Sequence, residues 1–176
     1  RAKVLEIQSW QNRSVLVRLS VSDGEAFTPK AGQYIIVNSQ VIQANGKPAK
    51  RAYTVIGSEK KGEFFLGVKG VEAGPGSQYI RNLLSGAEVL FSGPYGKFQV
   101  PQGQKSKLVT AIATDTGITA IASLAQSTEW SEFTPAKMRL IWLLNEENYF
   151  LDIPVLANLF RGWQIQKIFT GSIGDP

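Results

Sequence analysis

The sequence contains no cysteine and no histidine, since the counts of both residues are 0. Without cysteine there are no disulfide frameworks, thiolate nucleophiles, Cys-ligated iron–sulfur clusters or zinc sites of the cysteine type. Without imidazole there is no Ser-His-Asp triad, no His-bound zinc and no ordinary general base that titrates near neutral pH. If the protein is an enzyme, we therefore expect a cofactor to carry the chemistry, and we expect no metal site.

Long apolar runs are also missing, and stretches such as Leu140–Leu144 fall far short of the roughly 20 residues that cross a bilayer. The sequence thus predicts no membrane span. With 176 residues, of which 43% are hydrophobic and 10% aromatic, the chain is too apolar for disorder and fits one large or two small domains. No signal peptide is visible after Arg1, and we expect a cytoplasmic protein.

The charges are few and dispersed. Lys and Arg number 19 against 14 Asp and Glu, a net charge of +5 that favours anionic partners. The longest uninterrupted basic run is Lys60-Lys61, so no basic arm or helix stands out and we expect no nucleic-acid partner.

Short strands dominate the first hundred residues. In Ser14–Val21 apolar and polar residues alternate strictly, which is typical of a half-buried strand. Similar runs separated by turn residues predict further strands at Val4–Ile7, Tyr34–Val37, Tyr53–Ile56, Phe64–Val68 and Val89–Phe91. We expect residues 1–101 to form a small closed antiparallel β-barrel.

One short helix interrupts this barrel in the prediction. Ile80, Leu83 and Leu84 have helical spacing, and Gly86 suits the C-terminal cap.

The pattern changes after Pro101. Continuous apolar strands and helices alternate as βαβαβ: Leu108–Ala113, Ile118–Ala125, Met138–Leu144, Pro154–Phe160 and Ile165–Phe169. This alternation predicts a doubly wound parallel sheet covered on both faces in residues 102–176. The prediction is β followed by α/β, and the second domain is short for its type, so we expect it to be incomplete at its C-terminus.

Two segments of the barrel carry groups that suit a nucleotide. In Arg51-Ala52-Tyr53-Thr54 the guanidinium and the phenol ring share one side of a strand, so a ligand with an anionic and an aromatic part could contact both. Gly74-Pro75-Gly76-Ser77 precedes the helix and could receive phosphate. Taken alone, each also fits a structural role: a tyrosine in the core, and a turn followed by Ser77 as N-cap.

Two further segments are turns. Gly93-Pro94-Tyr95-Gly96-Lys97-Phe98 follows the last barrel strand and fits a domain-joining turn. The loop Thr114–Thr119 links the first parallel strand to its helix, where such folds bind nucleotides, but it lacks the G-x-G-x-x-G fingerprint. It fits a plain turn equally well.

In their order and spacing these four segments resemble the ferredoxin–NADP reductase family, in which an FAD-binding Greek-key barrel precedes a nucleotide-binding α/β domain. The resemblance implies that Arg51 contacts the FAD pyrophosphate, that Tyr53 lies against the isoalloxazine and that Thr54 lies near its N5. Tyr53 and Thr54 are then the expected catalytic residues.

Other positions complete the expected cofactor site. Gly74, Gly76 and Ser77 resemble the pyrophosphate loop, Thr116 and Gly117 resemble the tail of the nicotinamide dinucleotide loop, and we expect contacts from Val68 and Lys69.

The second domain departs from the family pattern. Thr114 and Asp115 replace paired glycines, which puts a carboxylate where a pyrophosphate should approach. Glu146 and Glu147 stand where an arginine often reads the 2′-phosphate of NADPH. We expect weak binding of NADH or NADPH, with no advantage for NADPH. The family's later Cys-Gly-Pro segment has no counterpart.

The sequence therefore predicts a reductase that passes electrons from a reduced nicotinamide nucleotide through FAD to an acidic redox protein such as flavodoxin or ferredoxin. Three alternatives stay open. One is a flavin-binding electron-transfer or scaffold subunit that has lost NAD(P)H binding. Another is a siderophore-interacting ferric reductase, suggested by Asp115, Thr119 and Ala120. The third is a flavin-free interaction domain.

Overall fold

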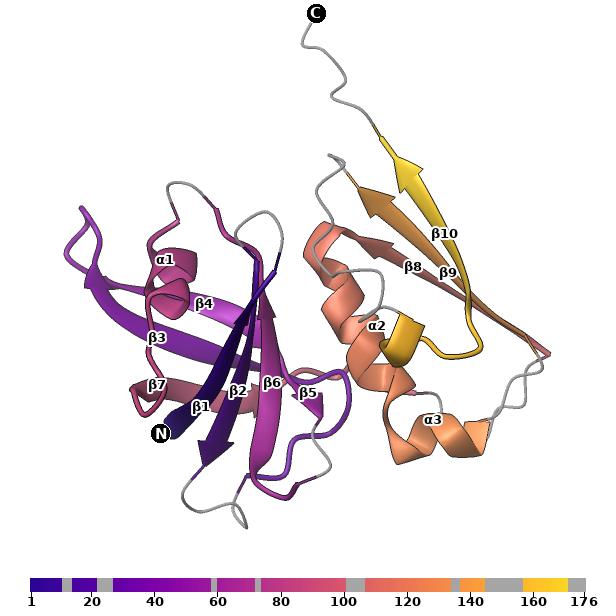
Figure 1. The fold of residues 1–176 in the computed structure, drawn as a ribbon, viewed down its shortest axis with the longest axis horizontal. Coiled ribbons are helices and arrows are strands. Elements are labelled where there is room, and N and C mark those ends of the chain that lie inside the picture. The colour runs from indigo at the N-terminus through magenta and orange to yellow at the C-terminus, as the bar shows by residue number, and fades with distance from the viewer. Residues whose placement is uncertain are drawn as a thin grey trace, which may run out of the picture.

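The computed structural model describes residues 1–10, 14–21, 27–57, 60–71, 74–100, 107–133, 137–144 and 157–170, without the side chains of 131–133. Figure 1 shows two units side by side, a curled antiparallel sheet and a small parallel sheet, with helix α2 on the side of the parallel sheet that faces the first unit. The expected domain boundary at residues 101 and 102 lies outside the described residues.

Seven strands form the antiparallel sheet in the order β4-β3-β7-β1-β2-β6-β5. Because β7 returns to lie between β1 and β3, the order is not sequential, as expected for a Greek key. The strands are β1 (Ala2–Ser9), β2 (Val15–Val21), β3 (Tyr34–Ile42), β4 (Pro48–Thr54), β5 (Ile56–Gly57), β6 (Glu63–Val68) and β7 (Glu88–Tyr95).

The expected closure of the barrel is wrong in one respect. Among the described residues no ladder joins the edge strands β4 and β5; instead the chain itself passes from one edge to the other through Val55. Thr54 still pairs with Tyr34 of β3, whereas Ile56 pairs with Phe65 of β6. The predicted strand Tyr53–Ile56 is therefore two strands, because the chain changes pairing partner at Val55.

The inner face of the barrel is closely packed. Val15, Val17 and Leu19 of β2 are buried, and so are Phe64 and Leu66 of β6, which confirms the alternation read from the sequence. Phe27 packs on Phe64 with ring centroids 5.0 Å apart. The residues that lie between these buried ones along each strand face outward. Each strand therefore presents one side to the core and the other side to solvent or ligand.

Helix α1 (Pro75–Arg81) is shorter than predicted. It ends at Arg81, and Leu84, expected on its buried face, is 76% exposed. Gly86 is no helix cap, because its N–H donates to the Val4 carbonyl (2.8 Å) and the chain there already runs beside β1. The pairing with β1 competes with continuation of the helix.

The second unit contains β8 (Leu108–Thr114), α2 (Ile118–Ala125), α3 (Thr128–Phe133), β9 (Lys137–Leu144) and β10 (Gln164–Phe169). The strands are parallel, in the order β10-β9-β8, which confirms the parallel sheet and matches one half of a doubly wound fold. Helix α3 was not predicted, since its six residues span fewer than two turns and give little periodicity. Of the expected helix Pro154–Phe160, residues 157–159 are helical and 151–156 lie outside the described residues.

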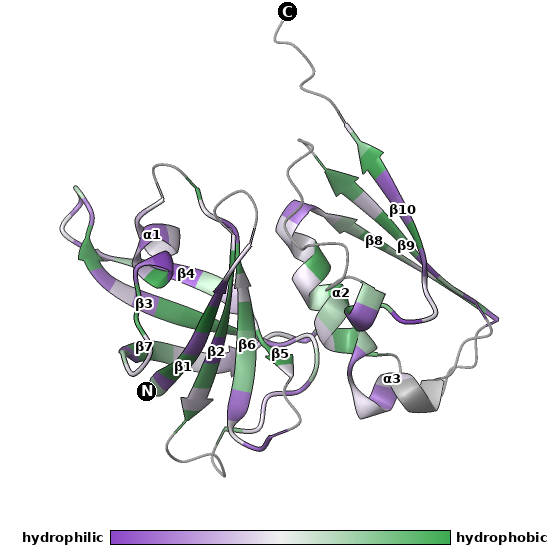
Figure 2. Cartoon of the chain, viewed as in Figure 1, coloured by the Kyte–Doolittle hydropathy of each residue, from purple (hydrophilic) through white to green (hydrophobic). Residues whose placement is uncertain are grey.

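Coverage of both faces, as predicted for this sheet, is not seen in the described part of the chain. Leu140, Trp142 and Leu144 of β9 are buried with α2 in a core cluster. On the opposite face Leu108 is 55% and Ile112 64% exposed. Figure 2 shows apolar residues along β9 and at the C-terminal end of β10, where hydrophilic residues precede them. The sequence pattern predicts that the strands are apolar, but it does not predict which face of the sheet the described helices cover.

Helix α2 joins the two units through a buried serine. The Ser123 Oγ accepts a hydrogen bond from the Gly32 N–H (3.0 Å) and donates to the Val55 carbonyl (2.6 Å). Gly32 has φ +81°, and a Cβ there would lie 2.0 Å from the Phe98 carbonyl oxygen, so only glycine fits. These bonds fix α2 against the point where β4 becomes β5.

None of the helices in the described residues is both long and apolar enough to cross a membrane.

Candidate functional site

A cavity of about 500 Å³ lies where the two units meet. One wall comes from β4, β6 and the start of α1, and the other comes from the turn between β8 and α2. Its lining residues are Arg51, Ala52, Tyr53, Thr54, Gly67, Lys69, Val71, Gly74, Ser77, Asp115, Thr116, Gly117 and Thr119. The volume suits a cofactor or another small ligand.

Arg51 and Tyr53 project from β4 toward the first turn of α1. A Cβ on Gly76 would lie 2.7 Å from the Arg51 Cγ and 3.6 Å from the Tyr53 hydroxyl oxygen. Glycine at 76 therefore leaves the space that both side chains use. The exposed Arg51 guanidinium donates to the Lys50 carbonyl (2.8 Å), and its remaining N–H groups suit an anion.

Tyr53 is partly buried and packs against the barrel core. Burial raises the pKa of Tyr53 from 10.0 to about 12, although the positive charge of Arg51 acts in the opposite direction. The phenol is therefore neutral at physiological pH. It offers a flat ring and an O–H group to the cavity rather than a charge.

The start of α1 differs from the expected capping. Gly74 is the N-cap and Pro75 follows it, so Ser77 is the third helical residue and not the cap. The buried Ser77 Oγ accepts from the Val71 N–H (3.1 Å) and lies 3.0 Å from the Gly74 carbonyl oxygen, to which it donates. The hydroxyl thus ties the loop before α1 into one shape.

An ion pair crosses the cavity from one unit to the other. The Lys69 Nζ donates to both carboxylate oxygens of Asp115, at 3.0 Å and 2.9 Å. The two side chains are 26% and 32% exposed. Lys69 follows β6, whereas Asp115 opens the turn after β8.

That turn is a single 3₁₀ turn, Asp115–Gly117, which leads into α2. Asp115 has a φ of +44°, in the left-handed region that favours glycine. Its carbonyl accepts from the buried Trp142 Nε1 (2.9 Å), and the Thr119 hydroxyl donates to the Thr116 carbonyl (2.9 Å). The backbone of this turn is therefore held in place.

The structure brings most of the predicted site residues together. Arg51, Tyr53, Thr54, Lys69, Gly74, Ser77, Thr116 and Gly117 line the cavity. Two do not: Val68 is 1% exposed and belongs to the barrel core, and Gly76 lies beneath Arg51.

The sequence reading missed Ala52, Gly67 and Val71 as lining residues. Gly67 lies two positions before Lys69, and the strand period of two could have indicated it.

Gly93 to Phe98 does not line this cavity. The strand β7 extends to Tyr95, so half of the expected turn is strand. Tyr95 lies beside Tyr34, with ring centroids 5.9 Å apart. Gly93 and Gly96 have φ values of +130° and +106°.

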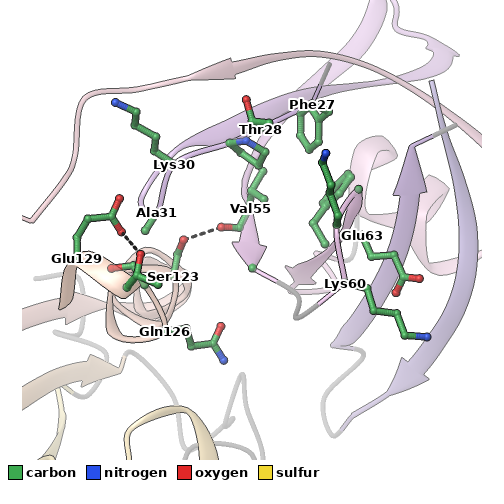
Figure 3. A pocket seen from close by; sticks show the side chains of 17 residues that line it. Phe27, Thr28, Lys30, Ala31, Val55, Lys60, Glu63, Ser123, Gln126 and Glu129 are labelled. Atoms are coloured by element: carbon green, nitrogen blue, oxygen red, sulfur yellow. Dashed lines mark hydrogen bonds between the residues drawn. The ribbon is translucent and has the colours of Figure 1, made fainter. Parts of the chain in front are cut away.

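A second cavity, of about 360 Å³, lies at the other end of α2 (Figure 3). Figure 3 shows Lys30, Lys60, Glu63 and Glu129 around it, together with the bond from Ser123 to Val55. None of the predicted site residues lines it. Its mixed charges favour no single class of ligand.

The first cavity fits FAD by its own chemistry. Gly76 lets the Arg51 and Tyr53 side chains lie against the first turn of α1, so that a guanidinium suited to diphosphate and a neutral aromatic ring stand together at the cavity. An antiparallel barrel with such a cavity, followed by a small parallel sheet, is typical of the flavin-dependent oxidoreductases related to ferredoxin–NADP reductase.

Residues 2–100 match the model of the oxidoreductase FAD-binding domain, and the chain belongs to that family, whose cofactor is FAD. The chain is 34% identical over 107 residues to ferredoxin–NADP reductase B of Sorangium cellulosum, covering 60% of this chain and 42% of that protein. It is 30% identical over 162 residues to NADH-cytochrome b5 reductase 1 of Cryptococcus neoformans, covering 85% and 54%. The chain thus spans about half the length of these curated relatives.

A solved structure confirms the fold. The cytochrome b5 reductase domain of Ulva prolifera nitrate reductase superposes with a TM-score of 0.74 at 22% identity, covering 99% of this chain and 75% of that one. Both units of the described structure therefore belong to this fold.

Proposed function

We propose that the chain is the FAD-binding and nucleotide-binding part of a reductase that takes electrons from NADH or NADPH. The observation that carries the proposal is the shared cavity, in which Arg51 and Tyr53 of the barrel face Thr116 and Gly117 of the parallel unit. The names of the two curated relatives support the choice of a pyridine nucleotide as reductant.

The barrel residues would hold FAD in a fixed orientation. Arg51 would neutralise its diphosphate, Tyr53 would cover the isoalloxazine ring, and the Thr54 hydroxyl would donate a hydrogen bond at the reactive edge. FAD supplies the hydride acceptance and the transfer of single electrons that no side chain of this sequence offers. The neutral state of Tyr53 is favourable, because a phenolate would repel the diphosphate.

The absence of histidine is compatible with this chemistry. Hydride transfer depends on alignment of the two rings and on exclusion of water, and it needs no imidazole base. The rigid turn Asp115–Gly117, held by Trp142, would position the nicotinamide side of the cavity.

For the acceptor we propose an acidic redox protein of the ferredoxin or flavodoxin type. The net charge of +5 would steer such a partner toward the chain. The name of the Sorangium relative, a ferredoxin–NADP reductase, supports the ferredoxin type.

A second candidate is a flavin-binding electron-transfer subunit that does not use pyridine nucleotide. It is favoured by one observation, the Asp115 carboxylate on the wall where a pyrophosphate would bind.

An absorption spectrum separates the two candidates. The chain loaded with FAD is titrated anaerobically with NADH and, separately, with NADPH. The proposed reductase loses its oxidised flavin absorbance within the time of mixing. A flavin spectrum that persists with both nucleotides, but bleaches with dithionite, would contradict the reductase and support the electron-transfer subunit.

A further inference from the structure

We propose that the Lys69–Asp115 ion pair is an intramolecular competitor of the pyridine nucleotide: an incoming diphosphate gains the Lys69 ammonium only when Asp115 releases it. The inference rests on the proposed function, because it assumes that the cavity takes this ligand. It assigns both residues a role in setting nucleotide affinity.

The geometry of the pair suits it to this role. Both Asp115 oxygens accept from one ammonium, at 3.0 Å and 2.9 Å, and both side chains line the cavity. Both are only about one-quarter to one-third exposed, so water screens them less than it screens surface charges. In this state the positive charge of Lys69 is matched by a carboxylate of the same chain.

The backbone of Asp115 is held in place by two hydrogen bonds of the turn, so the residue does not leave the cavity wall by a backbone movement. Its carbonyl is fixed by the indole N–H of Trp142, whose side chain is fully buried. The following turn is closed by the bond from Thr119 to Thr116. The carboxylate is therefore held on the cavity side, where it both occupies Lys69 and repels phosphate oxygens.

The pair also joins the two walls of the cavity, since Lys69 belongs to the barrel and Asp115 to the parallel unit. A ligand that separates the pair must replace the bridge with its own contacts. Its diphosphate is suited to this, because it accepts hydrogen bonds from an ammonium as Asp115 does.

The test measures affinity rather than turnover. NAD⁺ is titrated by calorimetry into the full chain loaded with FAD, for the unchanged protein, Asp115→Asn, and Asp115→Asn combined with Lys69→Met. Asparagine keeps the shape of the side chain and tolerates a φ of +44°. Asp115→Gly is the second variant if Asp115→Asn folds poorly, because glycine adopts this φ freely.

We expect Asp115→Asn to bind NAD⁺ about tenfold more tightly, because repulsion disappears and Lys69 becomes available. Adding Lys69→Met should cancel most of that gain. Glu63→Gln is the matched control, because it removes the ion pair between Glu63 and Arg18 (2.8 Å), and neither residue lines this cavity. This variant should leave the affinity for NAD⁺ unchanged.

Three outcomes overturn the inference. If the unchanged protein binds NAD⁺ and Asp115→Asn binds it no better, the pair is structural only and the proposed function stands. If Asp115→Asn gains affinity that Lys69→Met does not cancel, Asp115 acts by repulsion alone. If no variant binds NAD⁺, the inference fails together with the proposed use of pyridine nucleotide.

Discussion

The two units of the chain bury their apolar residues in different ways. The antiparallel barrel encloses its core, because each strand directs one face inward and Val55 carries the chain from one edge to the other. The three-stranded parallel sheet packs α2 on one face, while Leu108 and Ile112 on the other are more than half exposed. The barrel therefore encloses its apolar residues, whereas the parallel unit has apolar surface that its described residues leave open.

The cavity reflects the same contrast. Its barrel wall carries Arg51, Tyr53 and Thr54. Its second wall carries a carboxylate that is paired with Lys69. We interpret the barrel wall as suited to one bound cofactor and the second wall as suited to a weaker, exchangeable ligand.

The largest effect is expected in the barrel core. Phe64→Ala should lower the free energy of unfolding by about 3–5 kcal/mol, because it removes a ring that contacts Phe27 and Phe91. Urea denaturation measures the change. Phe65→Ala is the matched control, since Phe65 is the next residue of β6 but faces outward under Arg18. Equal losses from both variants would contradict the single inward-facing core.

Cofactor binding provides the next test. Arg51→Ala should weaken FAD binding by about 1.5–3 kcal/mol, roughly ten- to a hundredfold, because a charge-assisted contact to the diphosphate is lost. Fluorescence titration of FAD measures this. Lys50→Ala is the control, since the neighbouring lysine is exposed and does not line the cavity. If Arg51→Ala binds FAD with unchanged affinity, Arg51 does not contact the diphosphate.

Periodicity in the sequence predicted the elements whose core contacts lie on one face. The alternation in Ser14–Val21 and the apolar strand Met138–Leu144 correspond closely to β2 and β9. Periodicity did not predict the ends of elements that are set by tertiary contacts. Hydrogen bonds to β1 end α1 before Leu84, and a change of pairing partner at Val55 divides the predicted strand Tyr53–Ile56 into two.

The site could be predicted in part. The residues Arg51 to Thr54 are consecutive in the sequence and resemble a flavin motif, so their place on one wall of the cavity could be predicted locally. The ion pair could not, because Lys69 and Asp115 are 46 positions apart and meet only after the two units pack. The bond from Trp142 to the Asp115 carbonyl spans 27 positions and has no local signal either.

A pH titration should show a smaller effect in the cavity. The pKa of Tyr53 rises from 10.0 to about 12 on folding, so the neutral phenol stabilises the folded chain below pH 10. That contribution should be lost as the pH rises through about 12. Unfolding free energies measured across this range should fall less steeply for Tyr53→Phe. Identical slopes would show that the Tyr53 phenol is solvated in the folded state.

The smallest effect is expected on the open face of the parallel sheet, and it tests the contrast between the two units directly. Ile112→Thr should change the free energy of unfolding by less than about 0.5 kcal/mol, because an exposed isoleucine contributes little and threonine suits a strand. Leu140→Thr, one strand away on the covered face, is the matched control and should cost several times more, since Leu140 is fully buried against α2. If Ile112→Thr costs as much as Leu140→Thr, the outer face is covered in the folded protein, and the parallel unit encloses its core as the barrel does.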